Sequence, residues 1–408
     1  MNKNPSLYQK LVFRLLSRMK KGRLCLMTPD GESYEFGGLD GEVEAKLQVH
    51  NENFFSRCIL YSDIGFGESY VEGDWTTDSI TNVIRWMILN WENNPGVSGS
   101  RASAAFVGVL RLFHRFKHLT RDNSLKGAIK NISAHYDLSN ELFETFLDPS
   151  MTYSCADFTL SDSSLEAAQM AKFERLAKSA KIRGGESVLE IGGGWGAFAI
   201  YLASKYGCKV TTITISKNQF DKMQQRVQQL GLTGQIDVRF VDYRHVEGKF
   251  DRIVSVEMLE AVGHKHLRSF FATADRLLNK NGLLAVQVIT SADSRYDQLK
   301  EGIDWIQTHI FPGSLLPSLA AMTEATKAVT SLQMFSLHHM GHHYAKTLRI
   351  WRENFNAALP RVKHLGFDER FIRSWNYYLS YCEAAFEMRH IDLAQIVYTR
   401  PNNIELNL

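Results

Sequence analysis

The chain lacks most of the features that place a protein outside the ordinary globular class. Its 408 residues include only 8 prolines, and no apolar run approaches the roughly 18 residues of a transmembrane helix. The N-terminus shows neither the apolar block nor the small-residue cleavage site of a signal peptide. We therefore expect two or three globular domains and no membrane-spanning helix.

Cysteine is sparse as well. The five cysteines are scattered, and no two of them form a C-x-x-C pair. A disulfide scaffold or a zinc framework is therefore not expected, and the pattern suits a reducing cytoplasm. These residues are Cys25, Cys58, Cys155, Cys208 and Cys382.

Neither sign of charge is in large excess. With 47 Lys and Arg against 44 Asp and Glu, the net charge of +3 gives no reason to expect a nucleic-acid partner. The distribution is more informative, because residues 101–130 contain seven Lys or Arg and a single acid, Asp122. This segment is either a solvated helix face or a basic amphipathic surface for anionic headgroups.

The first 95 residues have the pattern of a small α+β domain. Alternating residues predict strands, Asp30-Gly31 predicts a hairpin turn, and residues 93–100 have linker composition. We expect a separate N-terminal domain over 1–95 and a basic linker or helical segment over 96–130. The predicted elements are helices over 7–19, 51–60 and 77–91 and strands over 23–28, 33–36 and 44–49.

From residue 131 to 408 the pattern predicts a catalytic α/β domain. Apolar strands alternate with helical stretches, which is typical of a doubly wound parallel sheet. An aromatic-rich helical insertion is expected over 340–390. The predicted strands are 187–191, 209–215, 237–241, 250–256 and 283–289, with closing strands at 331–337 and 393–399.

The most informative stretch is residues 188–197 (VLEIGGGWGA), where an apolar strand runs into a glycine-dense turn. Such glycines allow backbone to approach a nucleotide-like ligand closely. A nicotinamide site would need a carboxylate about 20 residues later, but residues 209–219 contain no acid. Glu190, at the end of the first strand, instead favours the S-adenosylmethionine (SAM) site of a methyltransferase; a nicotinamide oxidoreductase is the weaker alternative.

Motifs between residues 130 and 400 resemble those of a known family. They are HYDLSN (135–140), MTYSCA (151–156), LEAAQMAK (165–172), TISKNQ (214–219), DYR (242–244), FDRIVSVEMLE (250–260) and IFPG (310–313). In this order they resemble the cyclopropane-fatty-acid synthases, including their mycolic-acid relatives. Phe54-Phe55 and residues 65–70 resemble the lipid-binding N-terminal domain of bacterial members.

The resemblance implies a fold and a reaction. The fold would be the class I SAM-dependent methyltransferase (Rossmann-like) doubly wound sheet of seven strands with a helical insertion. The enzyme would transfer a methylene unit from SAM to the double bond of an unsaturated phospholipid acyl chain, forming a cyclopropane and S-adenosylhomocysteine. It would be a cytoplasmic homodimer, peripherally associated with the inner membrane through basic helices at 10–25 and 101–130.

This reaction needs a base. Methyl transfer leaves a carbocation on the acyl chain, and a proton must then leave the new methyl group so that the ring closes. In the family the base is thought to be a bound bicarbonate, which would be held here by Cys155, Glu260, Ile289 and Tyr344, with Cys155 and Ile289 contributing backbone groups. Without the resemblance, these residues read as a buried thiol, a helix-start carboxylate and core positions.

Similarity also implies the residues that hold SAM. Tyr153 and Ser154 would lie near the methionine moiety, above Gly192 and Gly194. Thr214 and Gln219 would lie near the ribose and carboxylate, and Tyr243 beside the adenine. Glu190 would complete the site or, alternatively, cap the turn.

One departure concerns the base. Many family members have a histidine on the fifth strand where this chain has Gln287, and Ala261 replaces another common histidine. An amide can donate and accept hydrogen bonds but cannot carry a proton in catalysis. Our hypothesis is that bicarbonate is held differently or more weakly, so that either the ring still closes or C-methylation gives a methyl-branched or methylene fatty acid.

Two further interpretations are weaker. His338, His339, His342 and His343 have no zinc-site spacing, and we expect no metal. A non-catalytic lipid-binding protein with a relic SAM pocket is the alternative from another class. The intact turn glycines, Cys155, Glu260 and Tyr344 argue against it.

Overall fold

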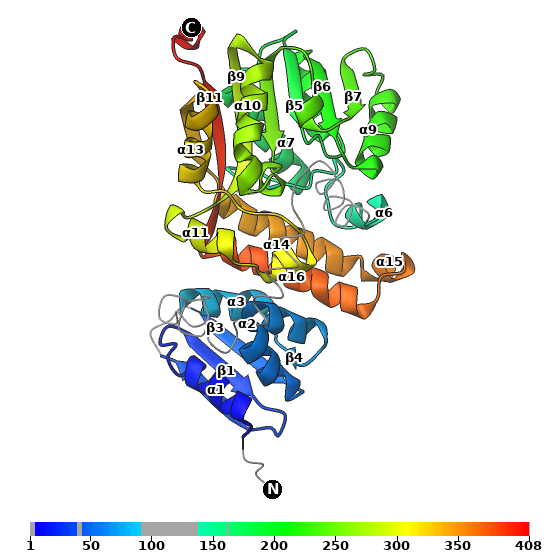
Figure 1. Ribbon diagram of the computed structural model, residues 1–408. Helices are drawn as coiled ribbons and strands as arrows, with labels where there is room; N and C mark the ends of the chain where they lie inside the picture. Colours follow the sequence, from blue (N-terminus) through cyan, green and yellow to red (C-terminus); the bar gives the residue numbers. More distant parts are fainter. Residues whose placement is uncertain (1–4, 39–42, 91–137, 161–162, 408) are drawn as a thin grey trace. The chain divides into compact units, whose positions relative to one another are not determined.

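The computed structural model describes residues 5–38, 43–90, 138–160 and 163–407, drawn in colour in Figure 1. Within these residues no helix is long and apolar enough to cross a membrane. The chain forms two compact units. Unit 1 contains Met1–Thr120, Glu301–Ile310 and Leu359–His390, and unit 2 contains Arg121–Lys300, Phe311–Ala358 and Ile391–Leu408.

Unit 1 is a small α+β domain to which two later segments contribute. Its sheet has the order β2-β1-β3-β4, with strands β1 (Arg23–Met27), β2 (Ser33–Gly37), β3 (Glu44–Val49) and β4 (Trp75–Thr76). Its helices are α1 (Leu7–Leu16), α2 (Asn53–Val71), α3 (Ile80–Leu89), α12 (Trp305–His309), α15 (Leu359–His364) and α16 (Glu369–Glu387). The sequence pattern assigns residues 301–310 and 359–390 to the catalytic domain, but they pack in this unit.

The core of unit 1 explains this packing. Trp75, Trp86 and Phe55 are fully buried, and α16 packs against α2 and α3. From α16 the Arg373 guanidinium donates hydrogen bonds to the backbone oxygens of Tyr70 and Trp75, at 2.7 and 3.0 Å. Two distant parts of the sequence therefore complete one hydrophobic core. The expected segment 96–130 lies outside the described residues.

Unit 2 contains the predicted seven-stranded sheet, in the order β10-β11-β9-β8-β5-β6-β7 (Figure 1). Neighbours from β9 to β7 are parallel, whereas β10 and β11 run antiparallel to theirs. The strands are β5 (Ser187–Ile191), β6 (Lys209–Thr214), β7 (Ile236–Phe240), β8 (Phe250–Val256), β9 (Leu278–Ser291), β10 (Gln333–His339) and β11 (Ile391–Thr399). All seven predicted strand positions are present.

Helices cover both faces of this sheet and leave its carboxyl edge for a ligand. Residues of α7 and α8 pack on one face and residues of α10 and α13 on the other, each group forming its own hydrophobic cluster. Ligands of such sheets bind beyond the carboxyl ends of the strands. The helices are α6 (Asn140–Phe143), α7 (Leu165–Ser179), α8 (Ala197–Tyr206), α9 (Lys217–Gln229), α10 (Leu267–Leu277), α11 (Asp293–Glu301), α13 (Leu319–Val329) and α14 (Gly341–Ala357).

Candidate active site

The glycine turn follows β5 at the carboxyl edge of the sheet. Gly192, Gly194 and Gly196 have φ of 86°, 55° and 87°, a left-handed conformation that favours glycine. A Cβ at Gly194 would meet no atom within 4 Å, so the turn is open there. The backbone of α8 begins directly after Gly196. This geometry fits a ligand that approaches the backbone closely, as SAM does in this fold.

The Glu190 side chain lies against the glycine turn, next to Gly193. Its buried carboxylate accepts a hydrogen bond from Thr212 Oγ1 at 2.6 Å, which links β5 to β6. Burial raises the pKa of Glu190 to about 7. A Cβ on Gly193 would lie 2.0 Å from Thr212 Oγ1, so glycine is required at this position as well.

The remaining residues assigned to SAM lie along the same edge. Thr214, at the end of β6, donates from Oγ1 to Gln219 Oε1 at 2.9 Å. Tyr243 follows β7, the neighbouring strand, and is largely buried. Tyr153 packs against the Trp351 ring, with centroids 5.2 Å apart. The structure thus supplies polar groups and aromatic surface suited to a nucleoside.

The centre of the site is Glu257, which the sequence analysis did not single out. It follows β8 with a φ of 50°, a strained conformation for a residue with a side chain. Its Oε1 accepts hydrogen bonds from Cys155 N at 2.9 Å and Gln287 Nε2 at 2.8 Å. Its Oε2 accepts one from the Tyr344 hydroxyl at 2.6 Å.

These three donors belong to residues expected to hold a bicarbonate or to stand at the family's histidine position. In the structure they converge on the carboxylate of Glu257 instead. Burial raises the pKa of Glu257, whereas Tyr344, the Cys155 backbone, Lys172 and Gln287 act in the opposite direction. The signal was available in the sequence, because Glu257 lies three residues before Glu260 in the motif FDRIVSVEMLE.

Glu260 and Ile289 form a separate pair. Glu260 Oε1 accepts a hydrogen bond from Ile289 N at 2.5 Å, so this backbone group, expected to hold bicarbonate, binds a side chain of the cradle instead. The other oxygen, Oε2, is buried without a hydrogen-bond partner among the described residues. Burial and the neighbouring Glu257 raise the pKa of Glu260 to about 8. Glu260 is therefore mainly protonated at neutral pH, so a neutral acid lies next to the Glu257 carboxyl group.

Gln287 has a fixed orientation. Its Oε1 accepts a hydrogen bond from Gln395 Nε2 at 2.9 Å, and the two residues are direct cross-strand neighbours on β9 and β11. Because the oxygen is taken by Gln395, the amide nitrogen of Gln287 points to Glu257. Gln287 thus supports the carboxylate but offers no group that titrates near neutral pH.

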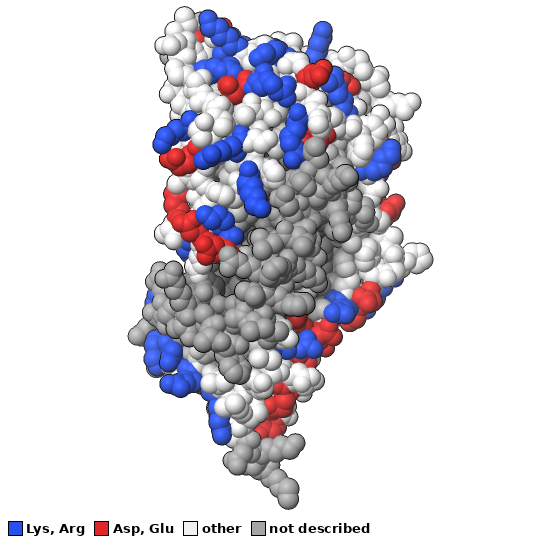
Figure 2. Space-filling view, in the orientation of Figure 1, with Lys and Arg blue, Asp and Glu red and all other residues white. Residues whose placement is uncertain are grey.

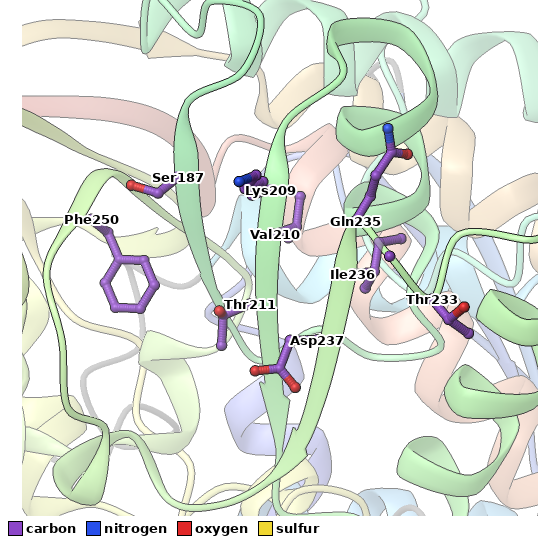
Figure 3. A pocket seen from close by; sticks show the side chains of 10 residues that line it. Ser187, Lys209, Val210, Thr211, Thr233, Gln235, Ile236, Asp237 and Phe250 are labelled. Carbon is purple, nitrogen blue, oxygen red and sulfur yellow. The ribbon is translucent and has the colours of Figure 1, made fainter.

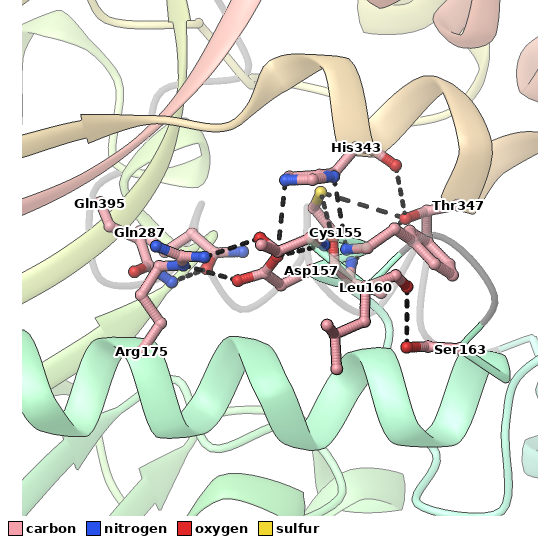
Figure 4. A network of polar contacts seen from close by, with 12 residues as sticks. Cys155, Asp157, Leu160, Ser163, Arg175, Gln287, His343, Thr347 and Gln395 are labelled. Atoms are coloured by element: carbon pink, nitrogen blue, oxygen red, sulfur yellow. Dashed lines mark hydrogen bonds and ion pairs between the residues drawn. The ribbon is translucent and has the colours of Figure 1, made fainter.

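Helix α14 holds the loop that carries Cys155 (Figure 4). Thr347 Oγ1 accepts a hydrogen bond from Ala156 N at 3.1 Å, and His343 Nδ1 accepts one from Phe158 N at 3.3 Å. His343 Nε2 faces Asp157, 3.4 Å away, which also pairs with Arg175 at 2.6 Å. Burial lowers the pKa of His343 to about 4, so this histidine is a neutral support for the loop.

A shallow groove lies elsewhere in unit 2 (Figure 3). It is lined by the first residues of β5 and β6 and by residues at the start of β7, including Ser187, Lys209 and Ile236. These are the amino ends of the parallel strands, so the groove is at the opposite edge from the glycine turn and Glu257. It contains none of the residues assigned to catalysis.

The sequence of the chain matches known proteins over most of its length. Residues 123–396 match the family described as mycolic acid cyclopropane synthetase. The tuberculostearic acid methyltransferase UfaA1 of Mycobacterium tuberculosis is 38% identical over 373 residues, which cover 89% of this chain and 86% of that protein. The cyclopropane-fatty-acyl-phospholipid synthase of Escherichia coli is 35% identical over 364 residues, covering 89% and 90%.

A solved structure agrees with the fold. The mycolic acid cyclopropane synthase CmaA1, complexed with S-adenosylhomocysteine (SAH) and CTAB, superposes with a TM-score of 0.63 at 31% sequence identity. The match covers 67% of this chain and 98% of that one.

Proposed function

The chain belongs to the mycolic acid cyclopropane synthetase family, and on this premise we propose that it transfers a one-carbon unit from SAM to the double bond of an unsaturated phospholipid acyl chain. Family membership makes it a SAM-dependent methyltransferase with the class I α/β fold and acyl chains as substrate. The observation that carries the finer proposal is the Glu257 carboxylate, held by three donors at the carboxyl edge of the sheet.

The chain offers a site for each part of the reaction. The turn at Gly192 and Gly194, with Thr214, Gln219 and Tyr243, would hold SAM, and Tyr153 and Ser154 would lie at its methionine end. When bound, SAM supplies an electrophilic methyl group whose addition to the double bond leaves a carbocation on the acyl chain. The Tyr153 ring, which packs against the buried Trp351, suits a cationic intermediate and helps to exclude water.

Glu257 is the base in this proposal. Its carboxylate takes a proton from the transferred carbon, and the electron pair of the broken C–H bond closes the ring onto the cationic carbon. Hydrogen bonds from Cys155, Gln287 and Tyr344 fix the direction of the carboxylate and lower its tendency to trap the carbocation as an ester. The products are the cyclopropane, SAH and one proton.

We infer that Glu257 replaces bicarbonate. The donors that an external anion would need already bind a carboxylate of this chain, and a second anion there would face its negative charge. The expected bicarbonate therefore does not fit the residues present. Turnover would then be independent of added bicarbonate.

A ring-free product is the second candidate. If a hydride shifts along the acyl chain before the proton leaves, the same deprotonation gives a methylene branch. Two observations favour this outcome. Gln287 stands where many family members have a histidine, and Glu257 binds the donors expected to hold bicarbonate. In addition, a relative is named a tuberculostearic acid methyltransferase. Both products are heavier than the substrate by about 14 mass units.

Unit 1 supports a membrane-bound substrate. On α1, Leu7 and Leu11 are 70% and 36% exposed, and Lys10 and Arg14 on the same helix are exposed as well. Figure 2 shows Lys and Arg side chains on the surface of this unit, with Asp and Glu side chains on the same face. An exposed apolar helix flanked by cations fits peripheral binding to an anionic bilayer. The proposed location on the inner membrane rests on this surface, and the homodimer remains a prediction from the family.

The test is the lipid composition of cells with and without this protein. Mass spectrometry should show acyl chains heavier by about 14 mass units, and proton NMR of the lipids separates cyclopropane protons from those of a methylene group. Unchanged acyl chains in the presence of expressed, folded protein would reject the proposal.

A further inference from the structure

Lys172 is a buried cation that the proposed chemistry does not yet use. It lies on α7, within the motif LEAAQMAK, and its side chain is fully buried. Its ammonium group donates a hydrogen bond to Ser154 Oγ at 2.7 Å and lies 4.4 Å from the centroid of the Phe173 ring. A lysine is almost never fully buried unless a charge or a function requires it.

Lys172 is connected to the base through the loop. One turn earlier on α7, Gln169 Nε2 donates to the backbone oxygen of Ser154 at 2.9 Å. Ser154 is followed by Cys155, whose N–H donates to Glu257. Two buried side chains of α7 therefore fix the segment that presents this N–H.

Lys172 also interacts electrostatically with acidic groups of the site. Burial lowers its pKa to about 8, while Glu257, Cys155, Asp148 and Glu190 favour the charged form. The main groups that favour the charged form of Glu257 are Lys172, a cation, together with Tyr344 from α14, Gln287 from β9 and the backbone of Cys155. Glu260, which follows β8, faces Glu257 as a second acid.

We propose that Lys172 is a positioning residue for the base: its ammonium group fixes the Ser154–Cys155 segment, whose N–H binds the Glu257 carboxylate, and supplies a buried positive charge to the same site. The inference rests on the proposed function, because it concerns Glu257 as the proton acceptor. Glu257 can accept a proton only when it is ionised, so the rate rises with pH through its pKa. Removal of the nearby cation raises that pKa and moves the rise in rate to higher pH.

The experiment compares pH profiles of the full-length protein. Turnover is measured with methyl-labelled SAM and vesicles of dioleoyl phosphatidylglycerol. We expect Lys172→Met and Lys172→Gln to shift the acidic limb upward by about one pH unit or more and to lower turnover at neutral pH by about tenfold. Lys172→Arg should return the acidic limb to its wild-type position. Ser154→Ala should lower turnover without shifting the acidic limb.

The matched control is Lys178→Met, on the same helix, where the side chain is 72% exposed; it should match the wild type. SAM affinity is measured by calorimetry in Lys172→Met, because Ser154 would lie at the methionine end of SAM and a loss of binding must be separated from a shift of the pH limb. A lower rate with the wild-type pH limb, or a loss of SAM affinity that accounts for the lower rate, would overturn the inference. If the lysine variants do not fold, wild-type turnover in Ser154→Ala would overturn it. A wild-type protein without any transfer would instead reject the proposed function.

Discussion

At the scale of single residues, the proposed chemistry centres on Glu257. The neighbouring Glu260 has a raised pKa of about 8 and is mainly protonated at neutral pH. Glu257 binds three hydrogen-bond donors, which a protonated carboxyl group could not accept equally well. The two acids of the motif VEMLE are therefore unequal, and their roles can be separated experimentally.

We expect Glu257→Gln to lose turnover by about a hundredfold or more, because a general base contributes at least this much. Glu260→Gln mimics the protonated form of Glu260 and should lose far less. The measurement is initial rate under saturating SAM, with calorimetry to check that both variants bind SAM. Equal losses in the two variants would contradict the assignment.

Gln287→His tests the product. A histidine at this position can still donate a hydrogen bond to Glu257 and can also carry a charge. It is the residue expected here from the resemblance to cyclopropane-fatty-acid synthases. We expect a larger share of cyclopropane relative to methylene product, measured by proton NMR of the extracted lipids. An unchanged ratio would show that this position does not control the product.

At the scale of elements, the sequence predicts the fold well. The glycine-dense turn and the alternation of strands and helices predict β5 to β11, because apolar strands and turn glycines are local signals. The same sequence does not predict which donors face Glu257. That depends on the left-handed φ of Glu257 and on β9, α14 and the loop at Cys155, which meet only in the folded chain.

Gly194→Ala tests the role of the turn. The added methyl group meets no atom within 4 Å, so the fold should lose only about 1 kcal/mol from the positive φ. SAM affinity should fall strongly, because the methyl group occupies the space that the ligand needs. Gly207→Ala is the matched control, since its φ is 67°, it also has open space, and it lies at the end of α8. Equal SAM affinity in both variants would argue against a ligand over Gly194.

At the scale of the whole molecule, the division into two units does not follow the order of the sequence. Residues 301–310 and 359–390 complete the core of unit 1 although they follow the strands of unit 2 in the chain. No local pattern encodes this return, because the amphipathic pattern of α16 shows that one face is buried but not which elements bury it. The proposed catalytic residues, from Cys155 to Gln395, all lie in unit 2.

Membrane binding depends on the surface of the whole molecule. We expect co-sedimentation with phosphatidylglycerol vesicles to weaken as salt is raised, because each nearby cation contributes about 1 kcal/mol. The double variant Lys10→Glu, Arg14→Glu should bind these vesicles less, and Leu7→Ser should weaken binding at all salt concentrations. Phosphatidylcholine vesicles are the control. Binding that is indifferent to salt would contradict the proposed surface.

The most direct measurement compares wild-type protein and Glu257→Gln in buffer freed of bicarbonate and in buffer with bicarbonate added. Methyl transfer from labelled SAM to dioleoyl phosphatidylglycerol is followed by mass spectrometry of the lipid. We predict that the wild type turns over equally in both buffers and that Glu257→Gln is inactive in both. A wild type that needs bicarbonate, or a Glu257→Gln variant that turns over normally, would contradict a base supplied by the chain itself.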